Sequence, residues 1–310
     1  MRLTVDFHVH STASDGTFAP RELVEKAARE EFAAIALTDH DNTDGVAEFL
    51  SAGAQLGVRT VAGVELSIEP GQAFDRFHLL GLGIDPANAA LKAFQRRILD
   101  GRNARNERIL ANFRRLGIEM AGEIASYAHG GVLARPHFAR WLMEHGYAKS
   151  IFAAFETYLL PDSPAATRCY EERYHPPQEE AFAVVHAAGG LCVMAHPKYW
   201  RVPWQHVGCE FAAAERELAA LKEKGLDGLE TLYRANRPEE NVEFTRMATR
   251  LGLLKSAGSD FHGANKPSIP LGMRVSEDFI APLLERLQGF RAPFSRPSRS
   301  PFSGRHANML

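Results

Sequence analysis

The sequence contains little cysteine and almost no net charge. Its three cysteines in 310 residues form no CxxC pair, which argues against a disulfide framework and makes a reducing cytoplasm the expected compartment. Lys and Arg number 36 against 38 Asp and Glu, so the formal net charge is −2. This near-neutrality argues against a generally basic surface for nucleic acid, although it leaves a local basic pocket open.

Long apolar runs are also missing. None approaches the roughly 18 to 20 residues of a membrane span, and the stretch MRLTVDFHVHSTASDG carries no signal-peptide pattern, so we expect no membrane association. The G-x-S-x-G elbow of serine hydrolases, the P-loop and the dinucleotide-binding glycine fingerprint do not occur. The remaining composition is that of an ordinary globular protein, long enough for one large α/β domain with or without an insertion.

Seven short apolar runs alternate with helical patterns. Such runs are typical of buried strands in a parallel sheet, which are apolar throughout. Between them, Pro20–Glu31 and Thr43–Leu56 have helical periodicity, with Pro20 suited to a first turn and Thr43 to an N-cap. Repeated strand–helix alternation predicts a closed or nearly closed barrel. The predicted strands are Leu3–Val9, Ala33–Leu37, Arg59–Val64, Phe77–Leu82, Leu191–Ala195, Gly228–Leu232 and Leu253–Ala257.

The alternation stops between about residues 85 and 177. A long helical pattern covers Ala89–Leu116, and shorter ones follow over Glu119–Ala128, Pro136–His145 and Ile151–Leu160. We therefore predict a discontinuous barrel, residues 1–98 and 169–290, with a helical insertion or cap domain over 99–168. The tail 291–310 is rich in Ser, Pro and Arg without acidic residues, a composition that predicts disorder.

Histidines and carboxylates stand at the ends of the predicted strands. His8 and His10 alternate with apolar residues, so both side chains face one side of the first strand. The other strand ends carry His40, Glu65, His196, Asp260 and His262, and His78 lies in the fourth predicted strand. Because the carboxyl ends of barrel strands open onto one face, we expect these side chains to meet in one pocket. Nitrogen and carboxylate ligands without thiolate favour Mn²⁺, Fe²⁺ or Zn²⁺.

The motifs HVHSTASDGT, LTDHDNTDG, GVELS, AHP and GSDFH resemble the signatures of the PHP (polymerase and histidinol phosphatase) family. The resemblance runs from about residue 3 to residue 275 and is loosest in the insertion. It implies an α/β fold, a distorted (β/α)7 barrel with a di- or trinuclear metal site that hydrolyses phosphoesters. Within the family the chain is most similar to the 3′,5′-nucleoside bisphosphate phosphatases and a related 5′→3′ exoribonuclease type.

The resemblance also implies a ligand set of two or three divalent metal ions per chain, with Mn²⁺ favoured. The first ion would be held by His8, His10, Glu65 and Asp260. Glu65 would bridge to a second ion, held also by His78 and His196, so Glu65, Asp260 and His196 are the predicted catalytic residues. Asp15, His40 and His262 would hold a third ion. Many relatives have histidine where this chain has Asp15, which leaves a plain turn residue as the alternative for that position.

Three residues are candidates for binding the substrate's phosphate. Arg135 and His137 resemble the subgroup's Arg-x-His, and a planar guanidinium can bind two phosphate oxygens at once. Lys198, two residues after His196, is a further candidate. The alternatives are a surface arginine beside a helix and a solvated loop lysine.

Two further sets of residues have alternative interpretations. Phe138 and Trp141 either stack on a base or belong to a core. The arginines of the long helix either follow a polynucleotide backbone or form a solvated face, and interrupting acids favour the solvated face. These arginines are Arg96, Arg97, Arg102, Arg105 and Arg108.

We therefore predict a cytoplasmic, metal-dependent phosphatase that acts on a small nucleotide. It would remove the 3′-phosphate from a nucleoside 3′,5′-bisphosphate, such as adenosine 3′,5′-bisphosphate, by attack of a metal-bridging hydroxide. The first alternative is 5′→3′ hydrolysis of short 5′-phosphorylated RNA. The second is a catalytically silent PHP module, disfavoured because acceptable ligands stand at all nine positions. No obligate protein partner is indicated.

Overall fold

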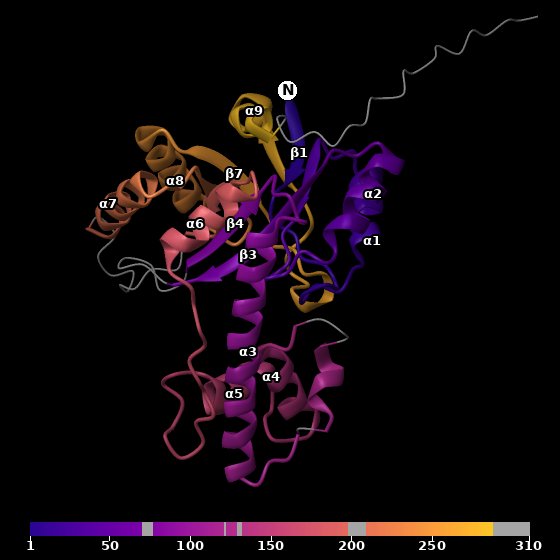
Figure 1. Ribbon diagram of the computed structural model, residues 1–310, viewed down its shortest axis with the longest axis vertical. Helices are drawn as coiled ribbons and strands as arrows, with labels where there is room; N and C mark the ends of the chain where they lie inside the picture. The colour runs from indigo at the N-terminus through magenta and orange to yellow at the C-terminus, as the bar shows by residue number, and fades with distance from the viewer. Residues whose placement is uncertain (70–76, 121, 129–131, 198–208, 288–310) are drawn as a thin grey trace, which may run out of the picture.

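The structure is a computed structural model, which describes residues 1–69, 77–120, 122–128, 132–197 and 209–287 (Figure 1). The predicted disordered tail 291–310 and the candidate phosphate ligand Lys198 lie outside the described residues.

The described strands form one eight-stranded sheet in the order β7-β6-β5-β4-β3-β2-β1-β8. All seven predicted strands are present, and β8 is a short strand that the apolar pattern did not indicate. Their bounds are β1 (Arg2–Asp6), β2 (Ala34–Leu37), β3 (Thr60–Ile68), β4 (Phe77–Leu82), β5 (Leu191–Met194), β6 (Gly228–Tyr233), β7 (Leu254–Gly258) and β8 (Met273–Ser276).

The prediction of a parallel sheet is wrong at β4. β4 is antiparallel to both β3 and β5, and β8 is antiparallel to β1. The connection between Ile68 and Phe77 is too short for the crossover of about a dozen or more residues that parallel pairing requires. The chain therefore turns back directly, which brings the first residues of β4 beside the last residues of β3.

The sheet curves until its far strand meets the chain beyond β1. Phe7 donates its backbone N–H to the carbonyl of Ala257 at 3.0 Å, and His10 donates to the carbonyl of Phe261 at 3.0 Å. Asp260 in turn donates to the carbonyl of His8 at 2.9 Å. These bonds join the end of β7 to the continuation of β1, so the fold is the expected distorted, nearly closed α/β barrel.

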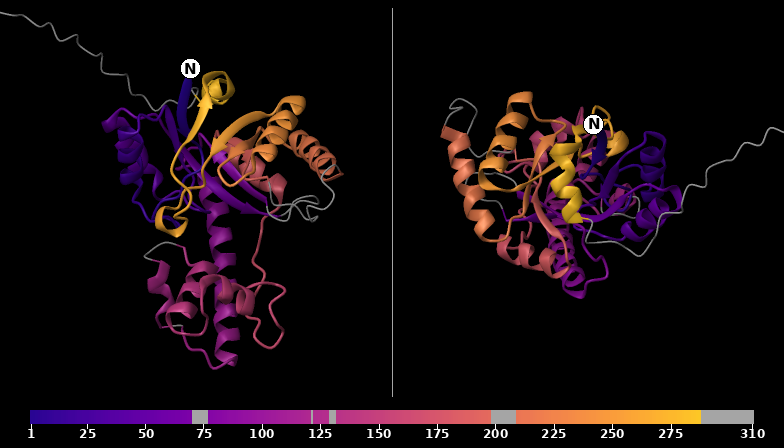
Figure 2. Two further views of the ribbon diagram at one scale, coloured as in Figure 1. Left: turned by 180° about the vertical axis from the view of Figure 1, so that it is seen from behind. Right: turned by 90° about the horizontal axis from the view of Figure 1, so that it is seen from above.

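Helices cover the outside of the barrel (Figure 2). Pro20 occupies the first turn of its helix, as predicted, whereas Thr43 is not an N-cap: the next helix begins at Val46 with Gly45 as its cap. The Thr43 hydroxyl instead donates to Gln95 Oε1 at 3.2 Å. The covering helices are α1 (Pro20–Arg29), α2 (Val46–Leu56), α6 (Gln178–Ala187), α7 (Cys209–Glu223) and α8 (Pro238–Leu251). A further helix, α9 (Glu277–Arg286), lies at the end of the barrel opposite the insertion (Figure 1).

The helical insertion lies at one end of the barrel, below it in Figure 1. Its long helix α3 (Ala89–Arg115) is continuous, so the predicted boundary at residue 98 falls inside a helix. Phe94 and Ile98 pack into the barrel's core, whereas Ile109 and Phe113 pack into a separate apolar cluster. This change of partner along one helix supports the insertion domain that we propose over residues 99–168.

The rest of the insertion is built from short helices. Phe138 and Trp141 lie in its apolar cluster, where they are 0% and 3% exposed, so they are core residues and do not stack on a base. The short helices are η1 (Ile124–Ala128, a 3₁₀ helix), α4 (Arg135–Glu144), α5 (Ile151–Ala154) and η2 (Phe155–Leu159, a π helix). Among the described helices, none combines the length and apolarity needed to cross a bilayer.

Candidate metal centre

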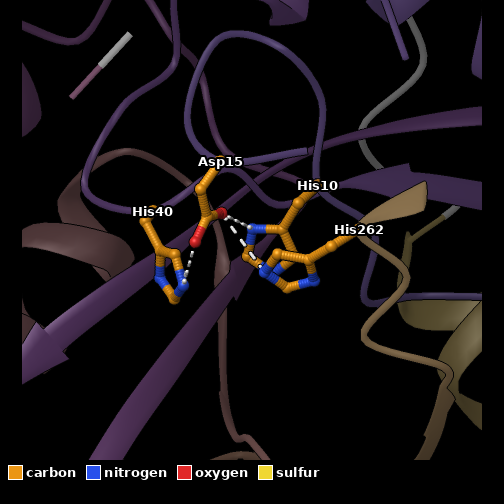
Figure 3. A group of neighbouring side chains, drawn as sticks. All are labelled: His10, Asp15, His40 and His262. Atoms are coloured by element: carbon orange, nitrogen blue, oxygen red, sulfur yellow. Dashed lines mark ion pairs between the residues drawn. The ribbon is translucent and has the colours of Figure 1, made fainter. Parts of the chain in front are cut away.

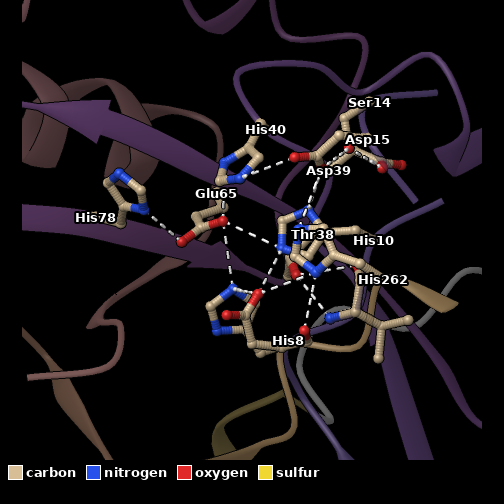
Figure 4. Close-up of polar contacts among 12 residues, drawn as sticks. His8, His10, Ser14, Asp15, Thr38, Asp39, His40, Glu65, His78 and His262 are labelled. Atoms are coloured by element: carbon tan, nitrogen blue, oxygen red, sulfur yellow. Dashed lines mark hydrogen bonds and ion pairs between the residues drawn. The ribbon is translucent and has the colours of Figure 1, made fainter. Parts of the chain in front are cut away.

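Glu65 on β3 lies at the centre of a cluster of histidines. Its carboxylate is buried, and both oxygens contact histidine nitrogens from other strands (Figure 4). The contacts are His78 Nδ1 at 2.7 Å and His196 Nε2 at 2.9 Å from Oε1, and His40 Nδ1 at 2.9 Å, His10 Nε2 at 3.2 Å and His8 Nε2 at 3.3 Å from Oε2. A carboxylate with nitrogen donors around each oxygen is suited to bridging two cations.

Two aspartates complete the cluster. Asp260 Oδ1 lies 3.3 Å from His262 Nδ1 and 3.4 Å from His10 Nε2. Asp15 Oδ1 lies 3.2 Å from His262 Nε2, and its Oδ2 lies 3.9 Å from His40 Nε2 (Figure 3). The structure thus brings together all nine residues that the family resemblance implied as metal ligands. Their individual roles as ligands remain predictions.

Most of these residues reach the cluster from the carboxyl ends of parallel strands. His78 is different, because it stands near the start of the antiparallel strand β4, directly opposite Ser67 near the end of β3. An antiparallel strand presents its amino-terminal end at the rim where its neighbours present their carboxyl ends. His78 therefore shares the rim with Glu65 for a reason that the prediction of parallel strands did not contain.

Backbone strain occurs where the strands enter the cluster. Among the described non-glycine residues with positive φ are Asp41 at 52°, His196 at 27° and Asp260 at 60°. Such conformations cost on the order of 1–3 kcal/mol each and persist only where surrounding contacts enforce them. These residues follow β2, β5 and β7, so the unusual backbone conformations occur where His196 and Asp260 enter the cluster.

A second set of buried groups orients the histidines. Glu230 on β6 lies 3.0 Å from His8 Nδ1 and accepts the backbone N–H of His196 at 2.6 Å. A proton on His8 Nδ1 leaves the Nε2 lone pair directed at the cluster, which is the usual role of a carboxylate behind a ligating histidine. A Cβ at position 258 would lie 2.1 Å from Glu230 Oε1, so Gly258 provides the space for this contact.

Other buried groups fix the loops that carry the cluster. Asp39 accepts the Ser11 backbone N–H at 2.8 Å, the Ser11 hydroxyl at 2.7 Å and the Ser14 hydroxyl at 2.5 Å, which holds the loop between His10 and Asp15. Sequence reasoning missed Glu230 and Asp39. Both are acidic residues within or beside buried apolar strands. That position was the signal in the sequence that could have indicated their role at the site.

Asp260 has two further partners that the sequence did not indicate. Its Oδ2 accepts the Tyr233 hydroxyl at 2.9 Å and lies 2.6 Å from Lys266 Nζ.

Asp6 lies beside the cluster and does not join it. Its carboxylate accepts the Ser259 hydroxyl at 2.6 Å and the Ser259 backbone N–H at 2.9 Å.

The charges of the cluster call for a cation. Burial alone would raise the pKa of Glu65, but the charges of His40 and His8 outweigh it and hold that pKa well below its ordinary value. The pKa values of Asp15 and Asp260 are lowered in the same way by neighbouring histidines. The carboxylates are therefore ionised at neutral pH and attract positive charge.

The same surroundings shift the pKa values of two histidines, His78 and His10, in opposite directions. Burial lowers the pKa of His78 to about 3, so its ring is neutral at pH 7 and one of its two nitrogens can donate a lone pair. At His10, the nearby carboxylates of Asp260 and Glu65 outweigh burial and raise the pKa to about 9. Without a bound cation, protonation of His10 offsets part of the negative charge of the carboxylates.

Unpartnered atoms support a metal site more directly. Several buried donor and acceptor atoms of the cluster have no hydrogen-bond partner among the described residues. They are His8 Nε2, His10 Nδ1, His10 Nε2, His40 Nδ1 and Glu65 Oε2. Buried polar atoms are rarely left without a partner. A nitrogen and carboxylate donor set of this kind fits divalent cations, with Mn²⁺, Fe²⁺ and Zn²⁺ all chemically suitable.

A cavity of about 570 Å³ connects the cluster with the insertion. Asp15, His40 and His78 line one end of it. Its lining also includes four arginines from the insertion and the chain that follows, Arg102, Arg105, Arg135 and Arg173. The predicted solvated face of α3 is therefore wrong for Arg102 and Arg105, which are 6% and 3% exposed.

The candidate phosphate ligands lie differently with respect to this cavity. Arg135 lines it, with its Nη1 3.3 Å from the Leu159 carbonyl and its guanidinium 5.2 Å from the centre of the Tyr170 ring. His137 is buried and is not among the described residues that line the cavity. Its Nδ1 accepts the backbone N–H of Ala134 at 3.0 Å, at the start of α4.

An α/β barrel with buried histidines and carboxylates at its rim belongs to the class of barrels with a divalent-metal site. The sequence profile of the PHP domain matches residues 6–156. The 3′,5′-nucleoside bisphosphate phosphatase of Chromobacterium violaceum is 33% identical over 86% of this chain and 90% of its own length. The 5′-3′ exoribonuclease Rnm of Escherichia coli is 32% identical over 87% of this chain and 88% of its own. The chain therefore belongs to the PHP domain family.

Solved structures give the same result for the fold. An amidohydrolase from Chromobacterium violaceum, with bound sulfate and no metal, superposes with a TM-score of 0.78 at 31% identity and covers 92% of this chain and 96% of its own. A structure from Bifidobacterium adolescentis, assigned as a metal-dependent phosphoesterase, has a TM-score of 0.75 at 28% identity and covers 91% and 96%.

Proposed function

We propose that the protein is a metal-dependent phosphatase that removes the 3′-phosphate from nucleoside 3′,5′-bisphosphates, such as adenosine 3′,5′-bisphosphate. The observation that carries this proposal is the single cavity that joins the candidate metal centre to Arg135 and three further arginines. A bisphosphate has two anionic groups at a fixed separation. The cavity would offer positive charge to each, from the proposed metal ions for one group and from the arginines for the other. The similarity to the Chromobacterium violaceum phosphatase over most of both chains supports the same substrate class.

We propose two or three divalent ions, with Mn²⁺ as the favoured metal. His8, His10, Glu65 and Asp260 would hold the first, and Glu65, His78 and His196 the second. Asp15, His40 and His262 would hold a third. Divalent ions in such a site polarise phosphoryl oxygens and lower the pKa of water, so that a nucleophile is available at neutral pH. The cysteines Cys169 and Cys192 are buried and free, which supports a cytoplasmic enzyme.

The protein's own residues position the substrate and balance its charge. Glu230 fixes the ring of His8, while Tyr233 and Lys266 fix Asp260, so the donor atoms are preorganised. Arg135 would bind the phosphate that does not react, because a guanidinium can bind two of its oxygens. His137 would support Arg135 from the start of α4, and Lys198 remains a candidate for a further phosphate contact.

The second candidate function is 5′→3′ hydrolysis of short 5′-phosphorylated RNA. The Escherichia coli exoribonuclease matches this chain at nearly the same identity and coverage as the phosphatase, which favours this alternative over others. A 5′-phosphate beside a 3′-phosphoester is common to both substrates. A catalytically silent module is disfavoured, because acceptable donors stand at all nine ligand positions.

A phosphate-release assay on the Mn²⁺-loaded protein tests the proposal. We expect the highest kcat/KM for adenosine 3′,5′-bisphosphate, compared with adenosine 3′-monophosphate, histidinol phosphate, a generic aryl phosphate and a 5′-phosphorylated oligoribonucleotide. The products of the oligonucleotide are measured as released mononucleotides. Higher kcat/KM for the oligonucleotide would replace the phosphatase with the exoribonuclease, and hydrolysis of none of these substrates would contradict both.

Arg135→Ala is expected to lower kcat/KM for the bisphosphate by about 10- to 150-fold, since a charge-assisted bidentate contact contributes roughly 1.5–3 kcal/mol. An aryl phosphate lacks the second phosphate, so its hydrolysis should fall far less. The matched control is Arg114→Ala, which removes an exposed arginine of α3 that does not line the cavity. Equal losses on both substrates would assign Arg135 to the reacting phosphate instead.

A further inference from the structure

Three side chains that can bind a metal meet between α6 and the sheet. They are His186 in the last turn of α6, Cys192 in β5 and Asp227 directly before β6. Each offers one donor atom, a nitrogen, a sulfur or a carboxylate oxygen, and these atoms lie within 4.8 Å of one another. None of the three belongs to the candidate metal centre, and the proposed phosphatase chemistry does not use them.

This cluster is separate from the candidate metal centre. Cys192 packs in the apolar cluster that includes Phe182 and Val185 of α6, whereas its neighbour Val193 belongs to a different apolar cluster. The two side chains therefore point to opposite faces of β5, as alternation along a strand requires. His196 follows Cys192 by four residues, which corresponds to roughly 13 Å of extended chain. One ion cannot bind both groups of residues.

Local contacts hold the imidazole and the carboxylate beside the sulfur. His186 Nε2 lies 2.8 Å from Asp227 Oδ2, and the same oxygen accepts the backbone N–H of Cys192 at 2.8 Å. The other oxygen of Asp227, Oδ1, has no hydrogen-bond partner among the residues that the structure describes. Gly225, at a φ of 116°, lies against the imidazole, and a Cβ there would be 3.0 Å from His186 Cε1. The donor groups are therefore brought together without an ion.

The thiol of Cys192 has no strong partner of its own. It is buried, and its S–H donates to the carbonyl of Phe182 at 3.7 Å, which is a weak contact. Burial raises the pKa of this thiol, so it keeps its proton when no cation is bound. A divalent cation that displaces this proton to solvent would be balanced by one thiolate and one carboxylate. The occupied site would then carry no net charge, which suits a position beside buried apolar side chains.

We propose that His186, Cys192 and Asp227 bind a zinc ion at a site of its own. Sulfur, nitrogen and oxygen donors together favour Zn²⁺ over Mn²⁺ or Mg²⁺, which prefer oxygen. Tetrahedral zinc, with bonds of about 2.0–2.3 Å, needs donor atoms roughly 3.3–3.6 Å apart. Donors already within 4.8 Å reach this geometry through shifts of about 1 Å. The side chains of His186 and Asp227 are 40% and 24% exposed, so water can take the fourth position.

Absorption spectroscopy of the full chain tests this site without interference from the candidate metal centre. Co²⁺ is the probe, because it accepts the same tetrahedral coordination as Zn²⁺ and its bond to a thiolate gives a charge-transfer band in the near ultraviolet. No residue of the candidate metal centre carries sulfur, so Co²⁺ bound there does not produce this band. We expect titration with Co²⁺ to produce the band at one thiolate per chain, and added Zn²⁺ to remove it by displacing the Co²⁺.

Matched variants assign the band to these three residues. Cys192→Ala should abolish it, whereas the double variant Cys169→Ala, Cys209→Ala should keep it, since Cys192 is then the one cysteine left in the chain. His186→Ala and Asp227→Asn should each weaken the Co²⁺ affinity measured at this band at least tenfold, because each removes one of three protein ligands.

The zinc site does not depend on the proposed function, because the band can be measured in a protein that hydrolyses no substrate. Absence of the band from the wild type, or its persistence in Cys192→Ala, would overturn the inference. So would an unchanged Co²⁺ affinity in both His186→Ala and Asp227→Asn, because the thiol would then bind the ion without them. His186→Ala removes a partly exposed side chain, so it keeps the test decisive if Cys192→Ala fails to fold.

Discussion

Glu65→Gln is expected to lower kcat for phosphate release by about 10²- to 10⁴-fold. Glu65 contacts five histidines through its two oxygens, and its charge is the only one shared between the first two proposed ions. Losing a charged contact to each of two cations corresponds to roughly 3–6 kcal/mol, which converts to this range of rates. Glutamine keeps the size of the side chain, so the effect reports charge and not packing. The measurement is kcat together with metal content by elemental analysis.

Asp15→Asn is the matched comparison. Asp15 lies at the edge of the cluster and is partly exposed. Its carboxylate lies 3.2 to 3.9 Å from His10, His40 and His262, and it accepts the Ser14 hydroxyl at 3.4 Å. Neutralising it should affect the third proposed ion alone and lower kcat less than Glu65→Gln does. If Asp15→Asn proved at least as harmful, with the other ions still bound, the proposed order of importance among the three ions would be reversed.

The strands were predictable because each is a short apolar run, and apolar burial is visible in sequence. Their directions were not equally visible. The sequence of β4 is a short apolar run like those of the other buried strands. Only the short connection between Ile68 and Phe77 forces β4 to be antiparallel to β3. β8, with the sequence MRVS, has an arginine and a serine in four residues and gives no apolar signal. It forms because it pairs with the edge of β1.

The residues of the candidate metal centre could be found because they stand at strand ends in recognisable motifs. The buried arginines that line the cavity could not be found in this way. Arg102 and Arg105 belong to a helix with many charged residues, and only the packing of the insertion against the barrel separates its buried arginines from its exposed ones. Arg173 lies in a segment that forms neither a helix nor a strand. Contacts between segments far apart in the chain determine which charges are buried, and a linear pattern does not contain that information.

Removal of divalent metal is expected to abolish phosphate release, and added Mn²⁺ should restore it. Every residue of the proposed ligand set is His, Asp or Glu, and several of their buried atoms have no other partner among the described residues. The measurement is activity after chelation and dialysis, and then after titration with Mn²⁺, Fe²⁺ or Zn²⁺. Full activity in protein that elemental analysis finds free of metal would contradict the proposed mechanism.

The proposed metal site also predicts how the stability of the protein depends on pH. In the metal-free protein the pKa of His10 is about 9, above its ordinary value of 6.5, so its protonation stabilises the fold fully below pH 6.5. That contribution is lost as the pH rises toward 9. Metal binding instead requires the unprotonated ring, so it strengthens over the same interval. The rise in Tm produced by Mn²⁺ should therefore be larger at about pH 8 than at about pH 6. An equal rise at both values would mean that the cation does not displace a proton from the cluster, and that His10 is not one of its ligands.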